Sequence, residues 1–325
     1  MENLPSDWFR LDKLRYLERP RALRTSLDRI WPRAADLPPV LGAGVVFQPI
    51  FRLDDSLGQD GARGYTVHGF EALARWVVPG EDSKPTDADG VPNWVGFPIG
   101  ARLLRASSSA ETLLRVDVQL WQKAASIIEH VWPNGSPYYL FVNSFPESLA
   151  APGLFLEAAL AFSRKYPWMV FEIPEADPGV AERELVFMRR DEKTREVYAP
   201  IRLAIDDFGV RHANLRRLLD FNYQYVKIDR EMRHGITEPA LEPALRGLIR
   251  GSKQYDKDQG SEILLEGIDV GEEDLLRAWH RAGLRLVQGY LLSKELSGQR
   301  LLENSRLEFP EVTDMLRGVA KPPAE

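Results

Sequence analysis

Residues 201–229, IRLAIDDFGVRHANLRRLLDFNYQYVKID, contain two short apolar runs that each lead into charged side chains. The first run, IRLAID, reaches Asp206 and Asp207, and the second, YQYVKID, carries Lys227 near its end. Short runs of this composition predict buried strands. The stretch therefore predicts two strands with charged side chains at the points where they end.

The same pattern recurs along the chain from about residue 44. The apolar runs that predict strands are VVFQPI, TVHGFEAL, YYLFVN, WMVFEI, IRLAID, YQYVKID, SEILLEGI and LRLVQGY. The stretches with a helical pattern between them are 111–131, 153–165, 178–193, 238–255 and 271–282. Alternation of strands with helices predicts a parallel sheet.

Two architectures fit this alternation. The span from Phe47 to Tyr290 is close to the roughly 250 residues of a (β/α)8 barrel. A doubly wound open sheet is the alternative, but no GxGxxG motif follows any of the predicted strands. We therefore predict an α/β fold: a (β/α)8 TIM-like barrel with a short helical N-terminal extension.

Composition shifts divide the chain into three predicted parts. Residues 1–40 form a basic helical extension, 41–310 the barrel domain, and 311–325 a C-terminal tail. The basic extension is interpreted either as amphipathic helices with solvated faces or as an arm for docking or dimerisation. A stretch at about 79–100, rich in Gly, Pro and acidic residues, predicts a long loop inserted in the barrel.

The overall composition excludes several classes of site and partner. With 44% hydrophobic and 28% charged residues, the chain is typical of a globular protein. No apolar run is long enough to span a membrane, and the net charge of −6 argues against a nucleic-acid polymer as partner. The absence of cysteine excludes disulfides and thiolate metal sites, and agrees with a cytoplasmic protein. A metal ion would need mostly oxygen ligands, which favours Mg²⁺, Mn²⁺ or Ca²⁺.

Polar residues stand where the predicted strands give way to loops. They are Glu71, Asn143, Glu172, Asp206, Asp207, Lys227, Glu266 and Gln288. A single acidic residue at such a place often only caps the next helix. In a (β/α)8 barrel, however, the carboxyl ends of all strands meet at the face that carries the active site. The repeated pattern therefore predicts one shared pocket.

The charges of these side chains favour bound cations. Five carboxylates around one pocket cannot all stay ionised beside Lys227 alone, whereas two divalent cations would balance them. Asp206 and Asp207 would face opposite sides of a regular strand, so both reach one site only if the strand ends there. Such a pair could serve two ions about 4 Å apart, the arrangement used to hydrolyse phosphodiesters.

The chain resembles the EAL domain, the bacterial cyclic di-GMP phosphodiesterase family, from about Val45 to Ser293. The motifs that carry the resemblance, in family order, are FQPI (47–50), GFEALAR (69–75), FVNSF (141–145), FEIPE (171–175), IDDFG (205–209), VKID (226–229), LLEGID (264–269) and VQGYLLS (287–293). The resemblance implies a barrel with two Mg²⁺ or Mn²⁺ ions that hydrolyses cyclic di-GMP to linear pGpG. It also implies a homodimer formed through the barrel.

The resemblance further implies a role for each matching residue. The metal ligands would be Glu71, Asn143, Glu172, Asp206, Asp207 and Glu266. Lys227 and Glu266 would be catalytic, with Lys227 activating or positioning the attacking water. Gln48, Leu73, Arg75 and Gln288 would bind the substrate. Glu175 would steady the loop after IDDFG.

Departures from the family pattern leave a second function open. The family usually reads DDFGTGYSS where this chain reads DDFGVRHANL, and its EGVE string is here EGID, ending in Asp269. In the family this loop couples dimerisation to metal binding. One hypothesis is an active phosphodiesterase, and the other a weakly active or inactive domain that serves as a cyclic di-GMP receptor or protein-interaction module. Another metal-dependent barrel hydrolase is disfavoured, because the set Gln48, Leu73 and Arg75 suits a cyclic dinucleotide.

Overall fold

The computed structural model describes the barrel strands and the helices beside them. The described residues are 44–54, 64–77, 94–96, 109–150, 152–174, 195–208, 223–229, 261–304 and 307–310, with the single positions Pro243, Gly247, Val312, Thr313, Met315 and Leu316. The predicted extension at 1–40 and the predicted helix at 178–193 lie outside them, as do most of 79–100 and of 238–255.

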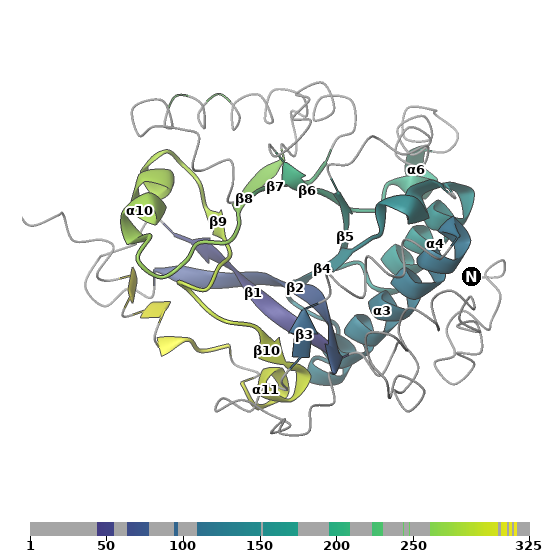
Figure 1. The fold of residues 1–325 in the computed structure, drawn as a ribbon, viewed down its shortest axis with the longest axis horizontal. Coiled ribbons are helices and arrows are strands. Elements are labelled where there is room, and N and C mark those ends of the chain that lie inside the picture. The colour runs from purple at the N-terminus through teal and green to yellow at the C-terminus, as the bar shows by residue number, and fades with distance from the viewer. Residues whose placement is uncertain are drawn as a thin grey trace, which may run out of the picture.

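Strands arranged in a ring close into a barrel, which confirms the predicted fold class (Figure 1). They are β1 (Gly44–Leu53), β2 (Tyr65–Val77), β4 (Tyr139–Asn143), β5 (Met169–Pro174), β6 (Leu203–Phe208), β7 (Tyr225–Ile228), β8 (Glu262–Leu265) and β9 (Leu286–Val287). The ring closes because β1 pairs with β2 on one side and with β9 on the other.

The expectation of a wholly parallel sheet is wrong for one strand of the ring. β1 runs antiparallel to both of its neighbours, whereas the pairs from β2 to β9 are parallel. A parallel connection needs a crossover of a dozen or more residues, usually through a helix. Only residues 54–64 connect β1 to β2, which is shorter than that, so the two strands form a hairpin. Two short strands, β3 (Trp94–Gly96) and β10 (Leu296–Ser297), extend β2 and β1 outside the ring.

Three predicted helices are confirmed within the described residues: α3 (Ala110–Val131), α4 (Pro152–Lys165) and α10 (Glu273–Arg281). The shorter helical segments are η4 (Pro146–Ala150), α6 (Arg195–Tyr198) and α11 (Gly298–Glu303). α3 and α4 lie outside the ring beside β4 and β5 (Figure 1). No helix in the described part of the chain is long and apolar enough to cross a bilayer.

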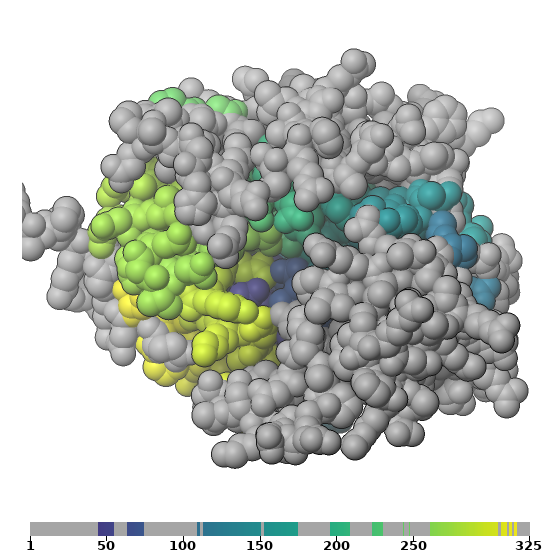
Figure 2. Space-filling view, in the orientation of Figure 1, coloured from purple at the N-terminus to yellow at the C-terminus, as the bar shows by residue number. Residues whose placement is uncertain are grey.

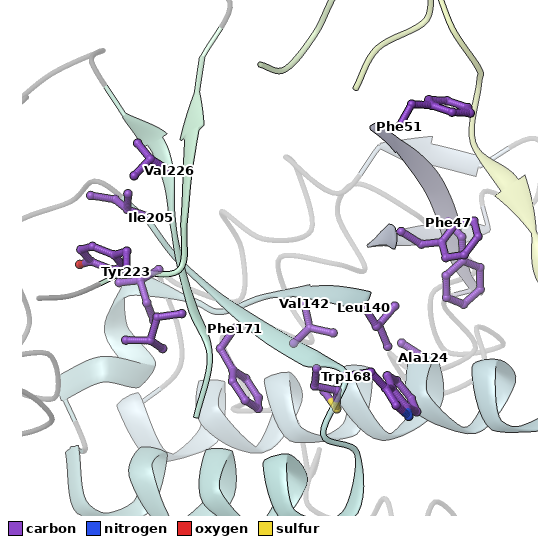
Figure 3. Close-up of a cluster of buried hydrophobic side chains, with 14 of the residues drawn as sticks. Phe47, Phe51, Ala124, Leu140, Val142, Trp168, Phe171, Ile205, Tyr223 and Val226 are labelled. Atoms are coloured by element: carbon purple, nitrogen blue, oxygen red, sulfur yellow. The ribbon is translucent and has the colours of Figure 1, made fainter. Parts of the chain in front are cut away.

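The strands are buried on both faces, as expected for a barrel with helices around it. On the outer face, Val142 and Phe171 point toward the helix that carries Ala124 (Figure 3). A second cluster draws one residue from each of several strands: Ile50, Phe141, Val170, Ala204, Tyr225, Leu264 and Leu286. Residues spread around a ring can contact one another only across its interior, so this cluster is an apolar layer inside the barrel.

The chain beyond α11 packs back onto the barrel. The Tyr65 hydroxyl donates to the Phe309 carbonyl oxygen at 2.9 Å and accepts from the Phe309 N–H at 3.1 Å. Phe51 packs edge-on against both rings. Val312 and Leu316 are buried in the same outer core, so this packing continues past residue 310.

Candidate functional site

A polar layer lies directly beside the apolar layer inside the barrel. Alternate residues of a strand face the same side, so the residue two positions from each apolar-layer residue also faces the interior. These residues are Gln48, Glu71, Asn143, Glu172, Asp206, Lys227, Glu266 and Gln288. On β2 the corresponding apolar-layer position is Gly69, where a Cβ would lie 2.5 Å from the Tyr139 carbonyl oxygen.

The expectation that these polar residues lie where strands give way to loops is wrong for several of them. Glu71 lies in the middle of β2, and Glu172, Asp206 and Lys227 also lie within their strands. β2 continues past Glu71 because it pairs with β1 as far as Arg75 and with β3 beyond that, with Gln48 opposite Glu71. The residues nevertheless come together, since they occupy one level of the interior.

Lys227 connects the carboxylates of this layer. Its Nζ lies 2.5 Å from Glu172 Oε1. It also lies 2.9 Å from Asp206 Oδ1, 2.8 Å from Glu266 Oε1 and 3.6 Å from Glu71 Oε2. The lysine side chain is only 1% exposed, so solvent screens these interactions weakly.

Amide side chains complete the layer around Glu71. Asn143 Nδ2 donates to Glu71 Oε1 at 3.0 Å. Gln288 Nε2 donates to Glu71 Oε2 at 2.7 Å and to Gln48 Oε1 at 3.0 Å. Both carboxylate oxygens of Glu71 are therefore held by amide donors, one at the end of β4 and one directly after β9.

Asp206 and Asp207 reach the same side through an irregularity in β6. The expectation that the strand ends at the pair is wrong, because β6 continues to Phe208. Its register against β7 shifts between Ile205 and Phe208, and Asp207 has a φ of 54°. A left-handed residue in a strand breaks the alternation of side chains. As a result, oxygens of Asp206, Asp207 and Glu266 all lie within 4.8 Å of one another.

The electrostatics of the site disfavour a full set of ionised carboxylates. Burial is the main cause that raises the pKa of Glu172 and of Glu266 well above its usual range. The neighbouring Asp206 and then burial raise the pKa of Asp207 to about 7. Burial alone would lower the pKa of Lys227, but the surrounding carboxylates raise it well above its ordinary range.

The donor set fits one or more divalent cations. Glu172 is fully buried, and its Oε2 has no hydrogen-bond partner within the described part of the chain. A buried carboxylate oxygen without a donor is costly unless a cation takes that place. Carboxylate and amide oxygens are the ligands that Mg²⁺ and Mn²⁺ prefer.

A cavity of about 210 Å³ adjoins this layer. Its lining includes Glu71, Leu73, Leu120, Trp121 and Asn143. Figure 2 shows a hollow at the centre of the molecule in which atoms of β1 and β2 are visible. A ligand in this cavity would therefore contact both the polar layer and apolar side chains.

Of the remaining predicted site residues, Leu73 is described in full, Arg75 only in its backbone, and Glu175 not at all. Leu73 lines the cavity beside Glu71. Arg75 belongs to β2, where its backbone pairs with Gly44 and Gly96, but its side chain is not among the described parts. Glu175 lies outside the described residues, as does the loop that follows Phe208.

Two residues near the site were absent from the predicted set. Asp117 and Trp121 lie one turn apart on α3, and both bond to the segment that begins at Asn143. The sequence feature that could have indicated Asp117 is its position as an acidic residue next to the apolar stripe of the predicted helix 111–131.

The chain is similar in sequence to curated proteins named as cyclic di-GMP phosphodiesterases. The chain is 25% identical over 243 residues to the probable cyclic di-GMP phosphodiesterase PdeN of Escherichia coli K12, an alignment that covers 71% of this chain and 40% of PdeN. It is 25% identical over 282 residues to the cyclic di-GMP phosphodiesterase RocR of Pseudomonas aeruginosa, covering 84% of this chain and 63% of RocR. The chain thus spans less than two thirds of either relative.

A solved structure shares the fold. The YkuI protein of Bacillus subtilis, which has an EAL domain and was solved with the substrate c-di-GMP and calcium, superposes with a TM-score of 0.58 at 20% identity. The match covers 86% of this chain and 62% of YkuI. The EAL domain family model matches residues 43–295, most of the sequence. The chain therefore belongs to the EAL domain family.

Proposed function

We propose that this protein is a metal-dependent phosphodiesterase that hydrolyses cyclic di-GMP to linear pGpG. The observation that carries the proposal is the polar layer, in which carboxylates from three strands and from the residue directly after β8 surround one buried lysine. Membership of the EAL domain family and the named activity of the curated relatives support it. Because the chain spans only part of those relatives, the activity is proposed for this domain.

The proposed metal ligands are the oxygen-bearing side chains of the layer and the residue that follows it on β6: Glu71, Asn143, Glu172, Asp206, Asp207 and Glu266. When bound, two Mg²⁺ or Mn²⁺ ions would lower the pKa of the attacking water and offset the negative charge of the transition state. Asp207 contributes because its left-handed backbone turns it toward the side of Asp206 and Glu266.

Lys227 and Glu266 are the proposed catalytic residues. Lys227 holds Glu172, Asp206 and Glu266 at one level through three short contacts. From that place we propose that it orients the attacking water, with Glu266 as its acidic neighbour. Lys227 is buried and Glu266 is mostly shielded from solvent, so their charges interact more strongly than they would in water.

Gln48, Leu73, Arg75 and Gln288 are the proposed substrate contacts. Gln48 and Gln288 are hydrogen-bonded to each other at the edge of the layer. Leu73 lines the cavity next to Glu71, which places an apolar surface beside the reacting groups. We propose that these side chains bind the nucleotide, and that Arg75 binds a phosphate.

Incubation of the purified protein with cyclic di-GMP and Mn²⁺ or Mg²⁺, with pGpG followed by chromatography, tests the proposal. We expect product only with the cation, and none from Glu172→Gln. Glu157→Gln on the exposed face of α4 serves as the control and should stay active. Tight binding of cyclic di-GMP without product would instead support the receptor function, and absence of both would overturn the proposal.

A further inference from the structure

We infer that helix α3 positions the proposed metal ligand Asn143 through Trp121 and Asp117. The inference rests on the proposed function, because it assigns to two residues of α3 a role in holding the cation site. Both residues hydrogen-bond to the segment that begins at Asn143, so each would act through the backbone there.

Trp121 contacts two of the strands that carry proposed ligands. Its indole N–H donates to the carbonyl oxygen of Asn143 at 2.9 Å. Its ring packs edge-on against Phe171, with 4.8 Å between ring centroids, and Phe171 directly precedes Glu172. Trp121 is itself 1% exposed, so these contacts hold a rigid, buried side chain.

Asp117 holds the same segment two residues further along the chain. Its Oδ2 accepts from the Phe145 N–H at 3.0 Å and from the Ser148 hydroxyl at 2.6 Å. Residues four apart on a helix lie on one face, so Asp117 and Trp121 stand side by side. Together they fix the peptide groups on both sides of Ser144, where the chain leaves β4.

This placement controls the direction of the Asn143 side chain. Asn143 is the last residue of β4, and its amide must point at Glu71 to make the 3.0 Å hydrogen bond. If the backbone could rotate at this point, the side-chain amide oxygen of Asn143 would point in many different directions. Partners that orient a metal ligand without touching the metal commonly change metal affinity by 10–100-fold, and α3 supplies such partners here.

Simple core packing does not account for Asp117. The side chain is 2% exposed, and a buried carboxyl group is costly where an apolar residue would serve. Its hydrogen-bond partners are the backbone after Asn143 and the η4 residue Ser148. The hydrogen bond from Trp121 to the Asn143 carbonyl oxygen involves no residue of η4. The contacts of α3 with this segment therefore do more than cap η4.

The matched pair Trp121→Phe and Trp279→Phe tests the inference in the full chain. Both tryptophans are 1% exposed, but the Trp279 indole N–H has no hydrogen-bond partner within the described residues. The measurements are Mn²⁺ affinity, KM and kcat for cyclic di-GMP, and urea unfolding. We expect Trp121→Phe to weaken Mn²⁺ binding by about 10-fold and Trp279→Phe by less than about threefold, at a similar loss of stability.

Asp117 provides the second comparison. Asp117→Asn keeps an oxygen that can accept both hydrogen bonds, and we expect Mn²⁺ affinity within about threefold of the parent protein. Asp117→Ala, or Ser148→Ala if that variant does not fold, should weaken Mn²⁺ binding more than Asp117→Asn does.

Equal Mn²⁺ affinities for the two Trp→Phe variants would overturn the inference alone. A parent protein that neither binds Mn²⁺ nor forms pGpG would overturn the proposed function, and the inference with it.

Discussion

Lys227 Nζ lies 2.5 Å from Glu172 Oε1 inside the barrel, where neither side chain is more than 1% exposed. A buried charge is tolerated when an opposite charge and hydrogen bonds compensate it. The Lys227 ammonium group lies within ion-pair distance of four carboxylates, those of Glu71, Glu172, Asp206 and Glu266. The pair therefore links the stability of the metal-free barrel to the chemistry of the site.

Replacing Lys227 with Met should separate these two roles. In metal-free protein, unpaired buried carboxylates should lower the free energy of unfolding by about 3 kcal/mol. Mn²⁺ should bind about 10-fold more tightly because a competing cation is gone, while turnover falls by about 100-fold or more. Isothermal titration, urea unfolding and pGpG formation measure the three effects. Lys165→Met at an exposed position of α4 is the control, and unchanged turnover in Lys227→Met would show that the lysine has no part in the reaction.

Glu172→Gln should make the metal-free protein at least as stable as the parent and weaken the effect of the cation. Burial and neighbouring carboxylates disfavour the ionised form of Glu172, and a neutral amide removes that penalty. Thermal unfolding with EDTA and with Mn²⁺ measures both states. We expect the rise in Tm on adding Mn²⁺ to shrink in the variant. An equal rise in both proteins would mean that Glu172 does not hold the cation.

The sequence predicts the polar layer well because its members share one rule. Most of them stand at or near the end of a short apolar run, and that position can be read along each run by itself. The helices α3, α4 and α10 are also visible as periodic patterns. The polar positions and the helical periodicity are both local features of the sequence, so they can be recognised without knowing which strand lies next to which.

Features that depend on the neighbouring strand could not be predicted. The antiparallel pairing of β1 with β9 joins two segments that lie far apart in the sequence. The left-handed backbone of Asp207 accompanies a shift in register against β7. A similar shift between Ile50 and Phe51 leaves His68 without an opposite residue on β1. Register is set by two strands together, so one strand's sequence does not contain it.

Gly289→Ala should reduce activity through Gln288. A Cβ at position 289 would lie 2.3 Å from backbone atoms of Ile268, so the loop after β9 would have to move. Ile268 N–H bonds to the Gln288 carbonyl oxygen at 3.3 Å, and the Gln288 side chain holds Glu71. We expect an activity loss of about 10-fold and a stability loss of about 1–3 kcal/mol, measured by pGpG formation and urea unfolding.

Gly153→Ala is the matched control for that change. A Cβ at Gly153 has nothing within 4 Å, and the residue lies in the first turn of α4. Alanine should therefore raise stability by about 0.5–1 kcal/mol and leave activity unchanged. If Gly289→Ala were as active as Gly153→Ala, the loop after β9 would not be positioning Gln288.

The pH dependence of stability should carry a contribution from His68, which the register shift in β2 turns into the barrel. Its Nδ1 lies 3.2 Å from Arg52 Nη2 and accepts from it, while its Nε2 lies 3.1 Å from the Tyr225 hydroxyl. Burial, and then the charge of Arg52, lower the pKa of His68 to about 3. The folded protein therefore keeps this imidazole neutral at pH values where the unfolded chain, with a pKa of about 6.5, is protonated.

The sign of the effect follows from proton linkage. The unfolded state binds the additional proton, so the stabilising contribution is complete above pH 6.5 and is lost as the pH falls toward 3. Between about pH 7.5 and 5.0 the loss should reach about 2 kcal/mol. His68→Gln keeps a neutral acceptor and donor without a titrating ring, so its unfolding free energy should fall by less over the same range. Urea unfolding at the two pH values measures the difference, with His130→Gln at an exposed position of α3 as the control. Equal pH dependence in the two variants would show that His68 is protonated alike in the folded and unfolded states.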